Sequence, residues 1–499
     1  MTESFWKKSI SIRAFDIMFI ISVVFICLVF SMGYFDTDGY WIIAQGREIL
    51  KHGIVHKNTL SINPNDAIVV QQWLYDVIIA LIYDFTGDVG LYIWNCLGWI
   101  GLCFVSYRFF RLRHIGKHFS LFFATLVSAT FIYMNMRPEC ISVILMIWQC
   151  CIMEKFINHE SHNEMFLLIL IMFLEINLHA SLWIFHIVLF LPYLVPIPFA
   201  KCTNCFNNTV FHFKDVFVII LGMIASLFFN PYGLDSILYL FKSMEPLTYV
   251  SISELQNTSY ISKNGLMVFA VIILLVIVIC KSKINSRDFF MISGILLLSM
   301  CTVRNVIFLP IALIYLIPCV FDLIHIDTNA IIKYITREFY LVFVAIIVCL
   351  MMFGVDSISN LKTFDMDLSD DSHTVDFAVD YLNKHEDRDV RLFTDFSTGA
   401  ICEFYGYRVY MDARPELHSY AFNKSKDMLK DYYCMVNGFD TDHKYLTCDD
   451  YEKIIKDYDF EYCIIRKSNM STFDMYLRSS SDLYDLVCEN DYYALYKVC

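Results

Sequence analysis

The sequence Phe35-Asp36-Thr37-Asp38-Gly39-Tyr40-Trp41 begins where the first long apolar run of the chain ends. It places two carboxylates, Asp36 and Asp38, at the mouth of a predicted membrane helix. At a bilayer interface that faces other helix ends, such carboxylates are candidates for metal binding or proton transfer. They also suit the start of a helix near Tyr40, because aspartate caps free backbone N–H groups. Both interpretations stay open until the rest of the chain is considered.

The composition is that of a membrane protein. Of the 499 residues, 57% are hydrophobic and 18% are charged, whereas soluble proteins average roughly 45–50% apolar and about 25% charged residues. The net charge of −13 and the lack of a basic stripe argue against nucleic-acid binding. Because acidic residues are frequent in the last third, we expect a transmembrane bundle over residues 1–356 and a water-facing domain over residues 357–499.

Basic residues set the predicted orientation of the first span. An apolar run at 14–35 is long enough to cross about 30 Å of hydrocarbon, and it follows Lys7, Lys8 and Arg13. By the positive-inside rule, the N-terminus is then cytoplasmic and Asp36 lies outside.

The next segment, 69–86, is diluted by Gln and Asp residues, which suits a helix lying in the interface. If this segment crossed the membrane, the following span would carry the basic residues of 108–117 outside, against the positive-inside rule. We therefore predict an outer loop over 36–87, about eleven spans in a multi-pass plasma-membrane protein, and an outer C-terminal domain. The predicted spans are 14–35, 88–107, 119–134, 140–156, 165–178, 182–199, 215–229, 265–280, 288–303, 306–321 and 338–355.

The C-terminal domain has the pattern of a small α/β fold. Short runs rich in β-branched and aromatic residues alternate with helical patterns. There is no GxGxxG or Walker A motif, so nucleotide binding is not supported. The predicted strands are 390–394, 409–412, 462–466 and an edge strand at 492–497, and the predicted helices are 375–382, 397–405 and 451–458.

Under this topology, a set of polar residues gathers at the outer helix ends. Arginines suit a phosphate or pyrophosphate through forked hydrogen bonds. A carboxylate suits removal of a proton from a sugar hydroxyl, and paired carboxylates suit a divalent cation. Each residue alone also has a structural explanation, such as helix packing, an ion pair or contact with lipid headgroups. The set consists of Asp36, Asp38, Gln72, Arg137, Glu139, His179, Glu254 and Arg304.

The order of these motifs resembles that of the GT-C superfamily of multi-spanning glycosyltransferases. Asp36-Thr37-Asp38-Gly39-Tyr40-Trp41 is similar to an Asp-x-Asp-x-x-Trp element after the first helix of bacterial members, and Gly46 matches a frequent glycine. Gln72-Trp73-Leu74 resembles a His-Glu-Trp-Leu segment with Gln in place of Glu, which leaves one acid fewer. The remaining matching motifs are Arg137-Pro138, Asn177-Leu178-His179, Asn230-Pro231-Tyr232-Gly233, Glu254, Gly399 and Met411-Asp412-Ala413-Arg414.

The resemblance implies transfer of a hexose or pentose from a polyprenyl-phosphate donor to an extracytoplasmic acceptor, usually with inversion. The acceptor would be a cell-envelope glycan, a lipid or a protein. Asp38 is the first choice for general base or metal ligand and Asp36 the second, with Mg²⁺ or Mn²⁺ as the cation. Arg137 and Arg304 would hold the lipid phosphate. The other substrate-binding residues would be Gln72, Glu139, His179 and Glu254.

Two other functions remain as alternatives. A transporter or flippase of a lipid-linked intermediate would need charges deep in the membrane and broken helices in paired halves. A non-catalytic receptor or assembly protein would use residues 357–499 as its working part. The polar motifs lie mainly at one face and no inverted repeat is evident, which favours the enzyme.

Overall fold

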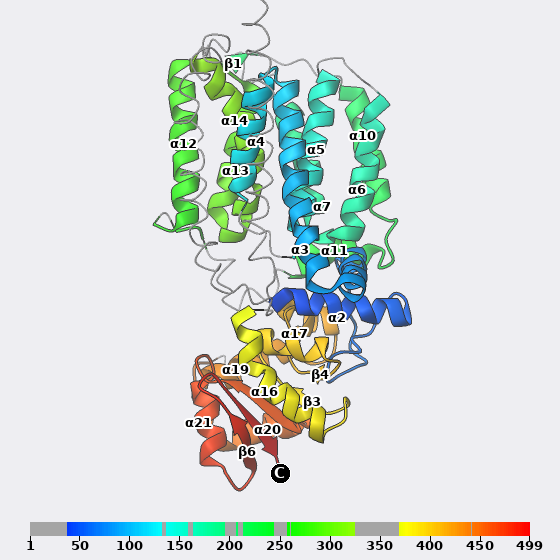
Figure 1. Ribbon diagram of the computed structural model, residues 1–499, viewed down its shortest axis with the longest axis vertical. Helices are drawn as coiled ribbons and strands as arrows, with labels where there is room; N and C mark the ends of the chain where they lie inside the picture. The colour runs from blue at the N-terminus through cyan, green and yellow to red at the C-terminus, as the bar shows by residue number, and fades with distance from the viewer. Residues whose placement is uncertain are drawn as a thin grey trace, which may run out of the picture.

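The computed structural model describes residues 37–131, 136–157, 163–194, 206–207, 213–243, 257–259, 261–324, 369–440 and 442–499. A helical bundle forms one end of the molecule and the C-terminal domain the other, with helix α2 (Thr37–His52) between them (Figure 1). The predicted spans at 14–35 and 338–355 and the predicted domain boundary at 356 lie outside the described residues.

The bundle is built from apolar helices that run along the long axis of the molecule (Figure 1). Among the described residues, four helices are long and apolar enough to cross a membrane: Trp73–Leu112, Glu139–Ile157, Asn264–Lys281 and Val303–Leu323. Shorter apolar helices at Phe119–Ala129, Ala180–Leu194 and Val216–Ser226 overlap three further predicted spans. The mostly helical membrane fold is thus confirmed, while the number of eleven spans stays a prediction.

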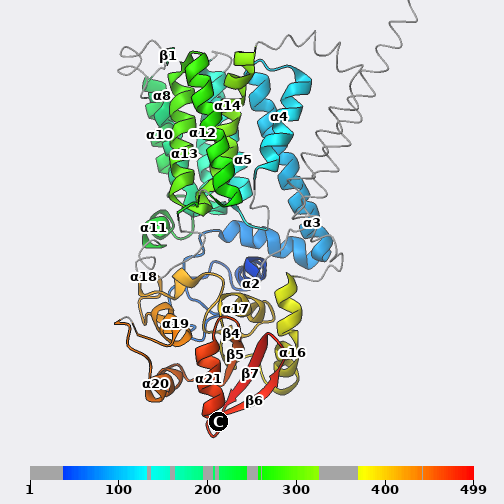
Figure 2. The same cartoon turned by 90° about the vertical axis from the view of Figure 1, so that its left-hand side faces the viewer.

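The elements of the bundle, in chain order, are α3 (Trp73–Leu112), α4 (Lys117–Ala129), α5 (Glu139–Ile157), η1 (Asn163–Phe166), α6 (Leu167–Leu178), η2 (Ala180–Leu182), α7 (Trp183–Val188), α8 (Leu191–Leu194), β1 (Phe206–Asn207), α10 (Phe213–Ser226), α11 (Leu234–Ser243), α12 (Lys263–Lys281), β2 (Ile284–Asn285), α13 (Ser286–Cys301), η5 (Val303–Phe308) and α14 (Leu309–Ile324). The two short strands β1 and β2 pair in parallel. In Figure 2 they lie at the end of the bundle away from the C-terminal domain.

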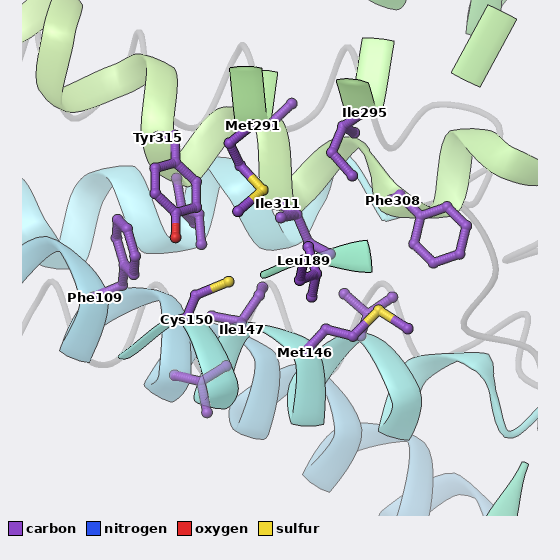
Figure 3. Close-up of a cluster of buried hydrophobic side chains, with 14 of the residues drawn as sticks. Phe109, Met146, Ile147, Cys150, Leu189, Met291, Ile295, Phe308, Ile311 and Tyr315 are labelled. Atoms are coloured by element: carbon purple, nitrogen blue, oxygen red, sulfur yellow. The ribbon is translucent and has the colours of Figure 1, made fainter. Parts of the chain in front are cut away.

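A buried apolar core joins these helices (Figure 3). The rings of Phe109 and Tyr315 meet edge-on with centroids 4.9 Å apart, next to Cys150. On the outside of α3, by contrast, Leu97 and Phe104 are 56% and 61% exposed. Large apolar side chains exposed along a bundle suit contact with lipid rather than water.

Helix α3 bends sharply at Gly87, whose φ of 61° and ψ of −152° suit glycine alone. Its first part lies across the base of the bundle, and its second part runs along the long axis (Figure 2). The bend agrees with the prediction that residues 69–86 lie flat while the next segment crosses. Where the bilayer lies along α3 remains part of that prediction.

Helix α2 packs directly on the first part of α3. A side chain at Gly46 would place its Cβ 2.1 Å from the backbone oxygen of Asp76. Glycine therefore permits a contact between the two helix backbones that any other residue would push apart. On the other side, the Tyr40 ring of α2 meets the Phe404 ring of the C-terminal domain at 5.3 Å, and the guanidinium of Arg47 lies 4.8 Å from the same ring.

The C-terminal domain contains a five-stranded sheet with the order β4-β3-β5-β7-β6. Strand β3 is parallel to β4 and β5, whereas β7 is antiparallel to β5 and β6. The domain comprises α16 (Ser369–His385), β3 (Arg391–Phe393), α17 (Phe396–Phe404), β4 (Arg408–Val409), η7 (Pro415–His418), α18 (Tyr420–Asn423), α19 (Met428–Asn437), α20 (Cys448–Tyr458), β5 (Tyr462–Arg466), α21 (Ser471–Ser479), β6 (Tyr484–Glu489) and β7 (Tyr493–Val498).

One prediction about the sheet was wrong, and one feature of the sheet was not predicted. The segment predicted as an edge strand, 492–497, forms β7 in the interior of the sheet, because β6 pairs on its outer side. The β4 side is covered by the early loop that follows α2: Val409 donates its N–H to the Leu60 carbonyl, and Ile62 donates to the Val409 carbonyl. Residues 60–62 thus tie the first quarter of the chain to the C-terminal domain.

The close approach at Gly46 predicts the effect of adding one methyl group. Gly46→Ala should lower the free energy of unfolding by about 1–3 kcal/mol, because the new Cβ overlaps a backbone carbonyl that cannot move away. Thermal unfolding of the detergent-solubilised protein measures this. Gly294→Ala is the control, since Gly294 lies in α13 with no heavy atom within 4 Å of its Cβ position. Equal melting temperatures for the two variants would contradict the assigned contact.

Candidate functional site

Asp38 and Arg137 form an ion pair where α2 meets the bundle. Asp38 lies in the first turn of α2, where a carboxylate is favoured by the helix dipole. Arg137 lies two residues before the start of α5, and its Nη2 is 3.3 Å from Asp38 Oδ2. Both side chains are mostly buried, at 16% and 15% exposure, so the pair links the start of α2 to the entry of α5.

A second ion pair joins the first residue of α5 to η5. Arg304 Nη2 donates to Glu139 Oε1 at 3.0 Å. The Glu139 carboxylate is buried, and its Oε2 has no hydrogen-bond partner among the described residues. Arg304 keeps a third of its side chain exposed. This guanidinium is therefore anchored at one end and still accessible.

His179 lies between α6 and η2, and it is held from both sides. Its Nδ1 is 3.0 Å from the Ser142 hydroxyl, and its Nε2 is 3.0 Å from the Ser181 hydroxyl. The side chain is 1% exposed and interacts electrostatically with Glu139. This geometry suits a residue that fixes the surroundings of Glu139.

Gln72 contacts an arginine of the C-terminal domain. Its Nε2 donates to Asp76 Oδ1 at 2.9 Å, and its Oε1 accepts a hydrogen bond from Arg414 Nη2 at 3.1 Å. The guanidinium of Arg414 lies 5.2 Å from the centre of the Trp41 ring, within cation–π distance. A side chain 342 residues further along the chain than Gln72 thus enters the region beside α2.

The segment that carries Arg414 is itself well fixed. Asp412 Oδ1 accepts a hydrogen bond from the Arg414 N–H at 2.6 Å, and Asp412 Oδ2 lies 2.9 Å from His418 Nε2. Glu416 accepts a hydrogen bond from the Tyr239 hydroxyl of α11 at 2.8 Å. These bonds hold residues 412–418 against the base of the bundle.

We name the assembled residues the junction cluster: Asp38, Gln72, Arg137, Glu139, His179, Arg304 and Arg414. Six of them were predicted from the sequence, and the structure places them at one end of the bundle, next to the C-terminal domain. Asp36 and Glu254, the other two predicted residues, lie outside the described residues. Arg414 was missed as a site residue, although its Met411-Asp412-Ala413-Arg414 motif was a signal in the sequence.

The predicted cation site was tested against the same geometry. Within the described part of the chain, no group of three or more His, Cys, Asp or Glu side chains is placed to hold a metal ion. Asp38 instead faces the guanidinium of Arg137, whose charge opposes a cation. The described residues alone therefore do not fit a metal. The metal prediction concerns Asp38 together with Asp36, and Asp36 lies outside the described residues.

The Asp412–His418 contact predicts a pH-dependent stability. Burial alone would raise the pKa of Asp412, but the charge and hydrogen bond of His418 and the Arg414 N–H outweigh it and hold this pKa below its usual value. A carboxyl whose pKa is depressed on folding stabilises above its unfolded pKa, and this stability is lost as the pH falls through the folded value. Asp412→Asn should cost about 1.5–3 kcal/mol at pH 7, and the difference from wild type should shrink below about pH 4.

Melting temperatures of both proteins between pH 3 and pH 7 measure this effect. Asp482→Asn, at an exposed position of the same domain, is the matched control. A difference between Asp412→Asn and wild type that stays constant over the whole range would contradict the pairing.

Comparisons with known proteins address the fold. No protein-family model and no curated protein sequence matches the chain. A structure of the archaeal oligosaccharyltransferase AglB from Archaeoglobus fulgidus, in complex with an inhibitory peptide and a dolichol-phosphate, matches with a TM-score of 0.59 and 10% identity. The match covers 92% of this chain and 72% of AglB.

A second solved structure matches over a similar length. It is an oligosaccharyltransferase of Archaeoglobus fulgidus tethered to an acceptor peptide, with a TM-score of 0.52 and 11% identity over 93% of this chain and 72% of that chain. At such identities the likeness concerns the fold, and it agrees with the order of motifs in the sequence. The chain therefore has the fold of these archaeal oligosaccharyltransferases.

Proposed function

We propose that this chain is a membrane glycosyltransferase that moves a sugar from a polyprenyl-phosphate donor to an acceptor on the outer side of the plasma membrane. The observation that carries the proposal is the junction cluster. Two ion pairs, Asp38–Arg137 and Glu139–Arg304, converge at one end of a GT-C bundle, beside a water-facing domain. Charged groups placed at a membrane surface in this way are costly unless they are paired and used.

The donor phosphate would lie between Arg137 and Arg304. Each guanidinium forms an ion pair with a carboxylate, Arg137 with Asp38 and Arg304 with Glu139, so both are held in place before a ligand binds. Guanidinium groups bind phosphate through paired N–H donors and stay charged at any physiological pH. They would therefore stabilise the negative charge that develops on the leaving phosphate.

Asp38 would act as the general base. Its carboxylate takes the proton of the acceptor nucleophile while the nucleophile forms a bond to the anomeric carbon of the sugar. The bond between that carbon and the phosphate oxygen breaks, and the electron pair leaves with the lipid phosphate. Attack from the side opposite the phosphate inverts the anomeric centre. Asp36 is the second candidate for the base.

The remaining predicted residues would shape the site. His179 is fixed by two serines and would position Glu139, and Gln72 would position Arg414. Glu254 is proposed to line the acceptor or donor pocket. The C-terminal domain, held on α2 by the Tyr40–Phe404 contact, would cover the site and bind the acceptor. A solved structure of AglB is in complex with an inhibitory peptide and a dolichol-phosphate, which fits a lipid carrier and an outer acceptor for this chain.

A transfer assay tests the role of Asp38. With purified protein and lipid-linked sugars, Asp38→Asn should lower kcat by about 10²–10⁴-fold, the usual contribution of a positioned base. Asp84→Asn is the matched control, because among the described residues Asp84 forms an exposed ion pair with Arg47 and no other. Full activity of both Asp38→Asn and Asp36→Asn would overturn the assignment of the base. The predicted cation is tested by measuring transfer after treatment with a chelator and again after Mn²⁺ is added back.

The same assay tests Arg304. Arg304→Gln should raise the KM for the lipid donor by about tenfold or more, since one charged hydrogen bond to phosphate is worth about 1.5–3 kcal/mol. Arg408→Gln, which removes only an exposed ion pair with Asp389, should leave this KM unchanged. Movement of a lipid-linked sugar across the vesicle membrane, without transfer of the sugar to an acceptor, would instead support the transporter alternative.

A further inference from the structure

Arg414 is an unusual charged group for its position. The residue is 7% exposed, yet it forms no ion pair within 4.0 Å among the described residues. Its only hydrogen-bonded side-chain partner in that part of the chain is Gln72, a neutral amide. Its Nε–H is buried and has no hydrogen-bond partner there. A buried guanidinium normally has a carboxylate directly on it, because an uncompensated buried charge is costly.

The surroundings point to an anion as the missing partner. The carboxylates of Asp38, Glu416 and Glu139 act on Arg414 only through space. The guanidinium carbon lies over the Trp41 ring, which accepts no conventional hydrogen bond, and the buried Nε–H is left for a ligand. Planar N–H donors match the oxygens of a phosphoryl group.

Gln72 explains why Arg414 is available. A glutamate at position 72 would reach Arg414 with a charge and neutralise it, at the 3.1 Å distance now occupied by the amide oxygen. The amide instead accepts one hydrogen bond without charge, and its Nε2 is used by Asp76. The Gln72 side chain therefore holds Arg414 in place without neutralising its positive charge.

We propose that Arg414 is a third phosphate-binding guanidinium, supplied by the C-terminal domain, and that the neutral side chain of Gln72 keeps it available for the ligand. This inference rests on the proposed function and deepens it, because the site would be complete only with the C-terminal domain in place. Binding and docking are then linked: a bound phosphate favours the docked domain, and a docked domain favours phosphate binding.

Binding of farnesyl phosphate to the full-length protein in detergent, measured by isothermal titration calorimetry, tests the proposal. Arg414→Gln should weaken binding by about tenfold or more, and Arg414→Lys should restore part of it by returning the charge. The matched control is Arg391→Gln. Arg391 also belongs to the C-terminal domain, where it donates to the Tyr458 carbonyl, and it holds the domain to the early loop through the Ile62 carbonyl. Because Arg391→Gln loosens the docked domain without removing a phosphate donor, it should weaken binding far less than Arg414→Gln does.

A second variant avoids removing the arginine. Gln72→Glu combined with Asp76→Asn should also weaken farnesyl phosphate binding, because the new carboxylate pairs with Arg414, while Asp76→Asn alone should not. Inorganic phosphate is titrated in parallel. Weaker binding of farnesyl phosphate alone assigns Arg414 to the lipid carrier, and equal weakening of both ligands assigns it to the phosphoryl group of either source.

The outcomes separate this inference from the proposed function. If Arg137→Gln and Arg304→Gln lose binding while Arg414→Gln and the Gln72→Glu/Asp76→Asn variant bind like wild type, the inference is wrong and the proposed function stands. If the wild-type protein binds neither ligand, both are wrong. If Arg391→Gln weakens binding as much as Arg414→Gln, Arg414 acts only by holding the domain, and the inference is overturned.

Discussion

The contact between α2 and the first part of α3 is the constraint on which the rest of the structure depends. Gly46 lets the backbone of α2 touch the backbone of α3 at Asp76. This contact fixes the position and the rotation of α2 relative to α3. Its first turn then brings Asp38 to Arg137, and its lower face presents Tyr40 and Arg47 to Phe404. This one close contact therefore determines where the charged side chains pair at the helix ends and where the C-terminal domain packs on α2.

Much of the fold could be predicted because membrane helices carry a strong local signal. Long apolar runs give their positions without knowledge of their neighbours, and the four long apolar helices each overlap a predicted span. The order of the strands could not be predicted. β7 was predicted as an edge strand, although four consecutive buried residues, Tyr493–Tyr496, are typical of an interior strand. β6 was missed because half of its side chains are exposed, as suits an edge strand, and it lacks a continuous buried run.

For the site, the sequence predicted which residues gather but not how they pair. The positive-inside rule and the alternation of spans were enough to put Asp38, Arg137, Glu139, His179 and Arg304 on one side. The pairing of Arg137 with Asp38 and of Arg304 with Glu139 depends on how helices rotate against each other, which no local pattern encodes. Arg414 was missed for a similar reason, because its contact with Gln72 requires the docked domain.

The bonds between the early loop and the β4 side of the sheet have a consequence for biosynthesis. Ile62 and Arg391, which share a hydrogen bond, are 329 residues apart in the chain. At about 5–20 residues per second, the ribosome needs on the order of tens of seconds to deliver the second partner after the first. Throughout that interval the backbone groups of the early loop that bond to the C-terminal domain lack these partners. Assembly of the C-terminal domain therefore closes a loop of more than 300 residues. Such non-local contacts form slowly, which makes maturation slow compared with insertion of the helices.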